Sequence, residues 1–314
     1  MSTEKRFSLD IKRAPFNMRA VLDMDKVKAL LILGGGSALG LAHIGVISVI
    51  EEHYEIAGVV GTSVGAIVGA MTCLGFSSAE LLRIASNDLA PLKIFSPLSL
   101  DSRISGIFNG KPVVKLFESW TSAGLIEDSL IPYLAVSFDL HTGRSILIDK
   151  GRFCDAMRAS SSLPVIFTPY ELGKHLCIDG GVEHPLPLAF ANRIPADVVI
   201  AVNVLPKTEP KPLLADPYAE AGKPERFMRY DVLLRSLHHN QSFLALQAIA
   251  RYEPDIVINA GKPNGKPFDF HKAEDFYRYG RQQAIKTLQE YGKPDFITLI
   301  RRRYKNLLAR YGKD

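Results

Sequence analysis

Residues 28–75 read KALLILGGGSALGLAHIGVISVIEEHYEIAGVVGTSVGAIVGAMTCLG, and this stretch decides the fold. It begins with a short apolar run, Lys28–Leu33, which leads through the glycines Gly34–Gly36 into a helical pattern of apolar residues. A second apolar run, Ile56–Val60, leads through the turn Gly61–Gly65 into a helical pattern of small residues. Strand, helix, strand and helix at this spacing predict parallel strands joined by crossover helices.

The rest of the chain continues this alternation. We expect helices at residues 38–53, 63–74, 79–89, 111–123, 153–162, 227–252, 273–291 and 294–311. We expect further strands at residues 132–139, 144–149, 197–204 and 255–259, with shorter strand pieces around the turn Gly173-Lys174. The segments 91–110 and 206–224 are predicted to be loops, the second of them a cover over a site. The pattern predicts one α/β domain at residues 27–290, between an N-terminal basic arm (1–26) and a C-terminal basic helix (291–314).

The composition of the 314 residues is that of a soluble globular protein, with 47% hydrophobic and 23% charged residues. No apolar run reaches the ~18 residues that a membrane span needs, and the start of the chain lacks the apolar core of a secretory signal. The three cysteines, Cys73, Cys154 and Cys177, form no CxxC pair. We therefore expect reduced, buried thiols in a cytoplasmic protein, and neither a disulfide framework nor a zinc site.

The formal net charge of +5 is modest, and basic residues gather near the two ends of the chain. Clusters of this kind form solvated helix faces, or bind anionic membranes or nucleic acids. No zinc-finger, helix-turn-helix or RNA-binding motif accompanies the basic residues, so we expect no nucleic-acid partner.

The second glycine turn, Gly61-Thr62-Ser63-Val64-Gly65, fits the pattern G-x-S-x-G. Small residues in this pattern also serve tight turns and the close packing of a helix on a sheet. The apolar run before the turn and the helical pattern after it favour a nucleophile elbow, in which a serine lies where a strand passes into a helix. Ser63 is therefore the candidate nucleophile.

The first glycine turn, Gly34–Gly40, has competing functional interpretations. A dinucleotide-binding fingerprint, G-x-G-x-x-G, fails because Leu39 or Ser37 occupies a glycine position in each register. A Walker A loop fails as well, since no Gly-Lys in the chain is followed by Ser or Thr. An oxyanion hole remains, because it needs only backbone N–H groups close to the reacting carbonyl.

A nucleophilic serine needs a base, and the residues leave two candidates open. His184 is the best placed of the eight histidines, and with Asp179 it would complete a triad in the order Ser, Asp, His. Asp179, in the turn Asp179-Gly180-Gly181, could instead take the serine proton directly. An aspartate with an ordinary pKa of ~3.9 is a poor base, so the second option requires a partly dry pocket that raises the pKa.

These motifs together resemble the patatin-like phospholipases. The resemblance rests on LILGGGSALGLAHIGV (31–46), GTSVGA (61–66) and CIDGGVEHPLP (177–187), in that order. The flanking segments VSFDLHTGRSILIDKG (136–151) and MRASSSLPVIFTPYELG (157–173) resemble bacterial members as well. The resemblance covers approximately residues 27–290 and leaves the two basic ends outside.

The resemblance implies a three-layer α/β/α sandwich with a mainly parallel central sheet. It also implies hydrolysis of fatty-acyl esters of phospholipids or lysophospholipids, without a metal or another cofactor. In the family a serine–aspartate dyad acts without histidine, and the dyad falls here on Ser63 and Asp179. The oxyanion donors fall on the backbone amides of Gly35, Gly36 and Ser37. The other motif glycines are Gly34, Gly40, Gly61, Gly65, Gly180 and Gly181.

Three positions depart from the usual family pattern. Ser37 stands where the family usually has glycine, and Leu39 where it has Lys or Arg. His184 stands where bacterial members often have Asn. Ser37 keeps its backbone N–H, whereas Leu39 removes a cation from the loop.

Two other functions are compatible with these residues. One is a thioesterase or acyltransferase on the same fold, and the other is a non-catalytic lipid- or nucleotide-binding regulatory protein. Because a lipid ester substrate is reached at an interface, we expect peripheral contact with the inner membrane surface through the basic ends.

Overall fold

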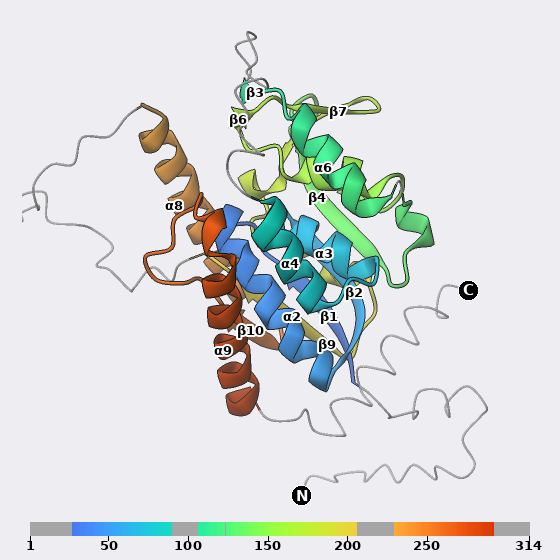
Figure 1. Ribbon diagram of the computed structural model, residues 1–314, viewed down its shortest axis with the longest axis vertical. Helices are drawn as coiled ribbons and strands as arrows, with labels where there is room; N and C mark the ends of the chain where they lie inside the picture. The colour runs from blue at the N-terminus through green and yellow to red at the C-terminus, as the bar shows by residue number, and fades with distance from the viewer. Residues whose placement is uncertain (1–26, 90–105, 123, 206–228, 292–314) are drawn as a thin grey trace, which may run out of the picture.

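The computed structural model describes residues 27–89, 106–122, 124–205 and 229–291 (Figure 1). The predictions for the basic arm, the loop at 206–224 and the helix at 294–311 lie outside the described residues. Among the helices described, none is both long and apolar enough to cross a membrane.

The centre of the molecule is an eight-stranded, mainly parallel sheet, as predicted. Its order is β10-β9-β1-β2-β4-β8-β7, with β5 also paired to β4. The first five of these strands are parallel, whereas β5 and β8 run antiparallel to β4 and β7 runs antiparallel to β8. The bounds are β1 (Lys28–Leu33), β2 (Glu55–Thr62), β4 (Tyr133–Asp139), β5 (Arg144–Ile148), β7 (Tyr170–Leu172), β8 (His175–Asp179), β9 (Val198–Asn203) and β10 (Ile256–Asn259).

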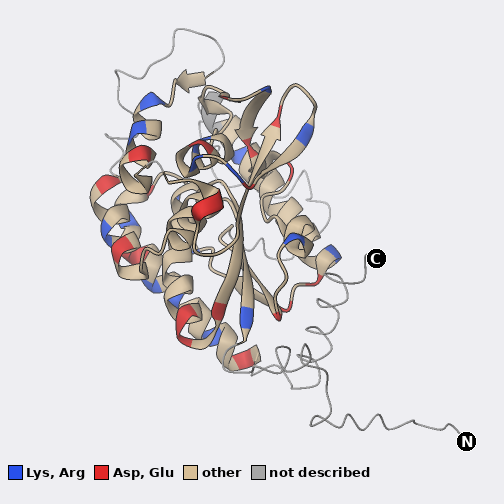
Figure 2. Cartoon of the chain, turned by 90° about the vertical axis from the view of Figure 1, so that its right-hand side faces the viewer, with Lys and Arg blue, Asp and Glu red and all other residues tan. Residues whose placement is uncertain are grey.

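Helices cover both faces of the sheet, which makes the fold a three-layer α/β/α sandwich. Strand β1 shows why, since Leu31 and Leu33 enter one apolar core while Leu30 and Ile32 enter the other, and all four side chains are fully buried. A continuous apolar run of this kind is typical of a central parallel strand. Charged residues lie mainly on the outer helices and loops (Figure 2).

In the described part of the chain, the first core lies between the sheet and a layer of six helices. These are α2 (Ala42–His53), α3 (Val64–Cys73), α4 (Ser78–Asp88), α6 (Lys111–Thr121), α7 (Phe153–Ser160) and α9 (Ala273–Tyr291). The second core lies under α8 (Arg229–Tyr252) and the short 3₁₀ helix η6 (Leu188–Arg193). The predicted buried thiols are confirmed, because Cys73, Cys154 and Cys177 are all buried and free.

The structure differs from the sequence prediction at several boundaries. The predicted loop at 91–110 is wrong for its last part, because β3 (Gly106–Phe108) pairs with β6 (Val165–Phe167) in a separate two-stranded sheet. Local sequence does not show this strand, since its partner lies far along the chain. The helix predicted from residue 38 begins as a 3₁₀ turn, η2 (Ser37–Leu41), before α2 starts. Helix α6 ends early because Ser122 adopts a left-handed conformation.

Candidate active site

Strands β2 and β8 meet on one edge of β4. Strand β2 runs parallel to β4 and places Thr62 opposite Val136, whereas β8 runs antiparallel and places Asp179 opposite Ser137. The two strands therefore point at each other along β4, and their last residues are neighbours. Because Ser63 directly follows Thr62, the sheet register brings the candidate nucleophile beside Asp179.

Ser63 occupies a strained backbone conformation at this point. Its φ of 56° and ψ of −124° lie outside the regions that most residues adopt. A conformation of this kind costs about 1–3 kcal/mol and persists only where its surroundings hold it. The Ser63 N–H donates to Ser160 Oγ (2.9 Å), and the Ser160 hydroxyl donates to the Val136 carbonyl oxygen (2.6 Å). Ser160 thereby ties the turn to β4.

Close packing of glycines sets the position of the same turn. A Cβ at Gly65 would collide with the carbonyl oxygen of Leu33, so only glycine lets the first turn of α3 lie on the end of β1. A Cβ at Gly35 would lie 3.2 Å from the Cβ of Ser63. The first glycine loop therefore lies directly against the candidate nucleophile.

Ser160 is a site residue that the sequence prediction missed. It is one of three consecutive serines, Ser160–Ser162, and nothing in the sequence distinguishes them. Only the fold shows their different partners. The Ser160 hydroxyl accepts from the Ser63 N–H, and the carbonyl oxygen of Ser162 accepts from the Asp179 N–H (2.9 Å). Ser161 lines an apolar pocket that is described below.

We expect Ser160→Ala to weaken both the fold and the site. Loss of the acceptor leaves the Ser63 N–H unpaired, which costs about 1–3 kcal/mol in the free energy of unfolding. Displacement of Ser63 lowers the rate of ester hydrolysis by up to about 10²-fold. Urea unfolding and kcat measure the two effects. Ser160→Thr keeps the hydroxyl and should retain most of both. Ser236→Ala, which removes a hydroxyl bonded to a carbonyl on α8, is the matched control. Equal behaviour of the Ser160→Ala and Ser236→Ala variants would contradict the prediction.

Asp179 is a buried carboxyl with an environment suited to proton transfer. Burial raises its pKa to about 6, although hydrogen bonds from the Ser63 side chain and the Gly181 N–H act in the opposite direction. The Gly181 N–H donates to Asp179 Oδ1 over 2.8 Å. A Cβ at Gly181 would lie 2.6 Å from Gln241 Nε2 and 2.9 Å from Asp179 Oδ1, so the buried Gln241 of α8 closes this side of the carboxyl. A pKa near neutrality is favourable for a general base.

The structure separates the two candidate bases. The His184 imidazole packs edge-on against Phe190, and its Nε2 lies 3.9 Å from a carboxylate oxygen of Glu183. The part of His184 that meets the elbow is its carbonyl oxygen, which accepts from Thr62 Oγ1 (2.8 Å). The interactions described for the imidazole involve neither Ser63 nor Asp179. The geometry thus offers Asp179 as the proton acceptor for Ser63.

The first glycine loop presents two backbone N–H groups rather than the three predicted. The Gly35 N–H donates to the Pro185 carbonyl oxygen (2.8 Å), and the carbonyl oxygen of Gly34 in the same peptide unit accepts from His43 Nε2 (2.8 Å). This peptide is therefore held on both sides, and its N–H is not available to a substrate. The hydrogen bonds of the described residues leave the N–H groups of Gly36 and Ser37 without an acceptor. These two amides are the candidate oxyanion donors.

Comparison with known proteins shows the family of this chain. Residues 31–192, which are 162 of the 314 residues, match the family model described as patatin-like phospholipase. The chain belongs to the patatin-like phospholipase family. The matched range contains both glycine turns and the Asp179-Gly180-Gly181 segment.

Several relatives of this patatin-like chain are known. An NTE family protein of Mycobacterium tuberculosis is 26% identical, over 84% of this chain and 92% of the relative. The neuropathy target esterase sws of Drosophila melanogaster is 30% identical, over 55% of this chain and 13% of the esterase. The lysophospholipase NTE1 of Scheffersomyces stipitis is 24% identical, over 84% of this chain and 18% of the lysophospholipase. Among solved structures, VipD from Legionella pneumophila has a TM-score of 0.46 and 13% identity, over 85% of this chain and 67% of VipD.

Ser37, where other patatin-like proteins usually have glycine, adopts a φ of 50°. A side chain in this left-handed region costs about 1–2 kcal/mol, whereas glycine there costs about 0.5–1 kcal/mol through the freedom it gains in the unfolded chain. We expect Ser37→Gly to raise the free energy of unfolding by up to about 1 kcal/mol and to keep activity, because the N–H remains. Urea unfolding measures the first effect. Ser37→Ala keeps the Cβ, so an equal gain from alanine would contradict this explanation.

Leu39, where the patatin-like pattern has Lys or Arg, is fully buried in the first core. A Cβ at Gly265 would lie 2.6 Å from a methyl group of Leu39, so the leucine packs closely against the segment after β10. A cation at this position would lose its hydration without an ionic partner. The leucine therefore fits the packing of this chain.

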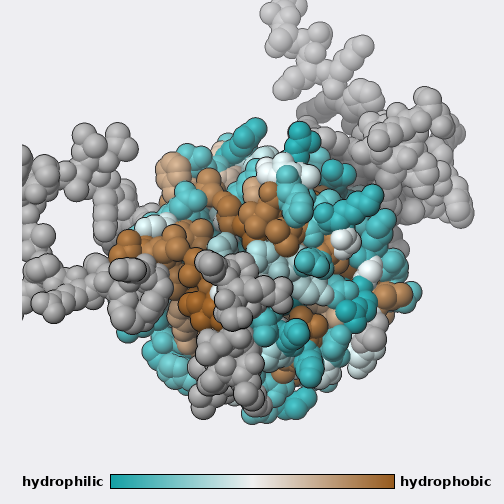
Figure 3. Space-filling model, turned by 90° about the horizontal axis from the view of Figure 1, so that it is seen from above, coloured by the Kyte–Doolittle hydropathy of each residue, from teal (hydrophilic) through white to brown (hydrophobic). Residues whose placement is uncertain are grey.

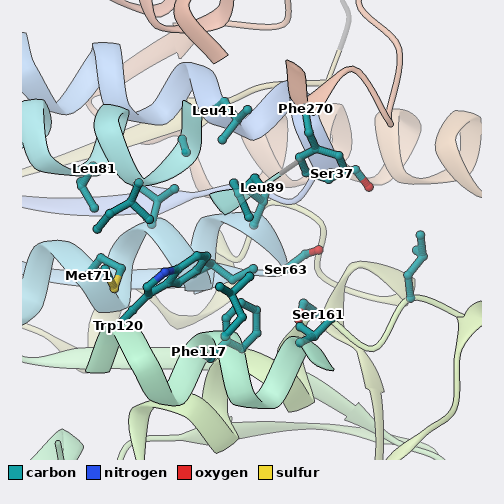
Figure 4. Close-up of a pocket in the computed structure, with 18 of the residues that line it drawn as sticks. Ser37, Leu41, Ser63, Met71, Leu81, Leu89, Phe117, Trp120, Ser161 and Phe270 are labelled. Carbon is teal, nitrogen blue, oxygen red and sulfur yellow. The ribbon is translucent and has the colours of Figure 1, made fainter. Parts of the chain in front are cut away.

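An apolar pocket lies beside Ser63 (Figure 4). The empty space at the pocket, counted together with the adjoining open solvent, is about 950 Å³. Ser37, Ser63 and Ser161 lie at one end, and the walls come from α2, α3, α4 and α6. Strand β6 also lines the pocket, and it lies with β3 on the upper side of the molecule (Figure 1). Seen from above, this side of the molecule carries patches of apolar surface (Figure 3). The lining is almost entirely apolar and includes Ser63.

Proposed function

We propose that this protein is a serine acyl hydrolase that cleaves fatty-acyl esters of phospholipids or lysophospholipids. Membership of the patatin-like family, with NTE-type relatives, supports lipid esterase activity as the general class. The observation that carries the specific proposal is the position of Ser63. It stands in a strained turn beside a buried carboxyl whose pKa is raised to about 6, at one end of an apolar pocket.

The first half of the reaction forms an acyl-enzyme. Asp179 accepts the hydroxyl proton of Ser63 while Ser63 Oγ attacks the ester carbonyl carbon. The negative charge that develops on the carbonyl oxygen is stabilised by the N–H groups of Gly36 and Ser37, and one such donor contributes about 10²–10³ in rate. The bond to the alcohol then breaks, and the leaving oxygen takes the proton from Asp179.

The second half releases the fatty acid. A water molecule gives its proton to Asp179 and attacks the carbonyl carbon of the acyl-enzyme. The same two N–H groups stabilise the second oxyanion. Ser63 Oγ then leaves with the proton from Asp179, which restores both side chains. One carboxyl thus serves as base and acid in both halves, which favours a pKa near the working pH.

A substrate panel tests the proposed function. Purified protein is incubated with lysophosphatidylcholine, phosphatidylcholine and an acyl-CoA of the same acyl chain, and released fatty acid is quantified. We expect release from the oxygen esters, and none from protein in which Ser63 is replaced by alanine. Preferential cleavage of the acyl-CoA would favour a thioesterase instead. Absence of release from every ester would contradict the proposal and favour a non-catalytic lipid-binding role.

A further inference from the structure

The apolar pocket has a defined length along α3. Ser63, Val64, Ile67, Val68 and Met71 all line it, so one wall follows a single face of the helix from the site serine to Met71. Eight residues at 1.5 Å rise correspond to ~12 Å. Figure 4 shows Ser63 at one end of the pocket and Met71 and Trp120 at the other.

Two further helices line the pocket in the same direction. Helix α6 contributes Val113, Leu116, Phe117 and Trp120, at the spacing of one helix face, and α4 contributes Leu81, Ile84 and Ala85. Met71, Leu81 and Trp120 lie on the side of the pocket opposite Ser63, at the left of Figure 4. All three side chains are buried, so the far end is shut off from solvent, and Trp120 is the largest side chain there.

The Trp120 ring is held in place by two neighbouring residues, Asp88 and Phe117. The indole is 9% exposed, its Nε1–H donates to Asp88 Oδ2 (3.2 Å), and its centroid lies 5.5 Å from that of Phe117. Its polar N–H is thus satisfied on α4, and the ring offers an apolar surface to the pocket. A ring fixed in this way forms a rigid end wall of the pocket, which we call the stop.

We propose that the pocket takes one acyl chain with its methyl end against Trp120, and that Trp120 sets the preferred chain length. This inference rests on the proposed function at Ser63. An extended chain advances about 1.2 Å per bond, because a residue of three bonds spans at most 3.6 Å. About ten carbons therefore fill the ~12 Å between Ser63 and the closed end. Longer chains have to fold or leave part of their length in water.

Fluorescence quenching tests the binding geometry without any turnover. Trp120 is the only tryptophan of the chain, so all indole emission comes from the closed end. Protein carrying Ser63→Ala is titrated with decanoyl lysophosphatidylcholine that bears bromine on the last two acyl carbons, or on the two carbons next to the carbonyl. We expect the bromines at the methyl end to quench the emission several-fold more strongly. Equal quenching by both positions, or none by either, would overturn the inference.

A chain-length series tests the role of Trp120 in selectivity. The kcat/KM values are compared for esters from hexanoyl to palmitoyl. We expect an optimum near decanoyl, and Trp120→Ala should raise the myristoyl-to-decanoyl ratio by about tenfold, the scale on which a pocket discriminates chains of different length. Val114→Ala, on the same helix but outside the pocket lining, should leave the optimum in place. Trp120→Phe keeps an aromatic stop and should shift the optimum less, which provides a second variant if the alanine protein is unstable.

The two proposals fail in different ways. Hydrolysis with a flat length profile and position-independent quenching would overturn the stop at Trp120 and leave the proposed function intact. Position-dependent quenching in a protein that hydrolyses no ester would support the acyl site and contradict the proposed function.

Discussion

Replacement of Ser63 by alanine is expected to abolish covalent labelling by a fluorophosphonate and to lower ester hydrolysis by about 10⁴–10⁶-fold. The probe reacts only with an activated serine hydroxyl. Ser63 has the features of one, because its turn is strained and its side chain hydrogen-bonds to the buried Asp179. Loss of the hydroxyl removes the acyl-enzyme route altogether, so the remaining rate is that of water attack assisted by the oxyanion donors.

Ser161→Ala is the matched control for this experiment. Ser161 lines the same pocket, but it directly follows α7 and its hydroxyl donates to the carbonyl oxygen of Met157 in that helix. We expect the Ser161→Ala protein to label like the wild type. Labelling that persists in the Ser63→Ala protein and disappears in the Ser161→Ala protein would show that the nucleophile has been misassigned.

Replacement of Asp179 by asparagine is expected to lower kcat by about 10²–10⁴-fold, the contribution typical of a general base. The amide has nearly the same shape and can still accept the Gly181 N–H, so the loss would be one of proton transfer rather than of position. His184→Ala is the matched control, because its imidazole packs on Phe190 and Glu183 and should contribute little to the rate. A larger loss of kcat from His184→Ala than from Asp179→Asn would contradict the Ser63–Asp179 dyad.

The same substitution should stabilise the protein at neutral and alkaline pH. The pKa of Asp179 is raised by burial from 3.8 to about 6 in the folded state, so the folded protein binds this proton more tightly than the unfolded chain does. The favourable contribution of the group is complete below its unfolded pKa and is lost as the pH rises through about 6. Two pKa units correspond to about 3 kcal/mol. We expect Asp179→Asn to raise the free energy of unfolding by about that amount at pH 8 and by little at acidic pH.

The pH dependence of activity follows from the same group. Asp179 acts as a base only when it is ionised, so kcat/KM should fall on the acid side with a pKa of about 6. His184→Ala should leave this acid limb unchanged. An acid limb that moves or disappears in the His184→Ala protein would assign the titration to the imidazole instead.

The local pattern of residues was sufficient to predict the order of strands and helices around the site. Continuous apolar runs such as Lys28–Leu33 predict buried parallel strands, and the glycine after each run predicts a turn, because both depend on neighbouring residues alone. Pairings between distant segments were not predictable. The strand at 106–108 forms only because Val165–Phe167 lies beside it.

The sequence by itself determined the identities of Ser63 and Asp179 as candidates and the glycine turns that surround them, since each motif is short and carries its own conformational preference. Only the tertiary structure favours Asp179 over His184 as the base, because the preference depends on β2 and β8 meeting on β4. It also pairs the Gly35 N–H with Pro185, ties Ser63 to Ser160 and forms the apolar pocket lined by Ser63 and Trp120. Each of these depends on which groups share a hydrogen bond or a cavity across the fold, and such contacts leave no trace in the order of residues.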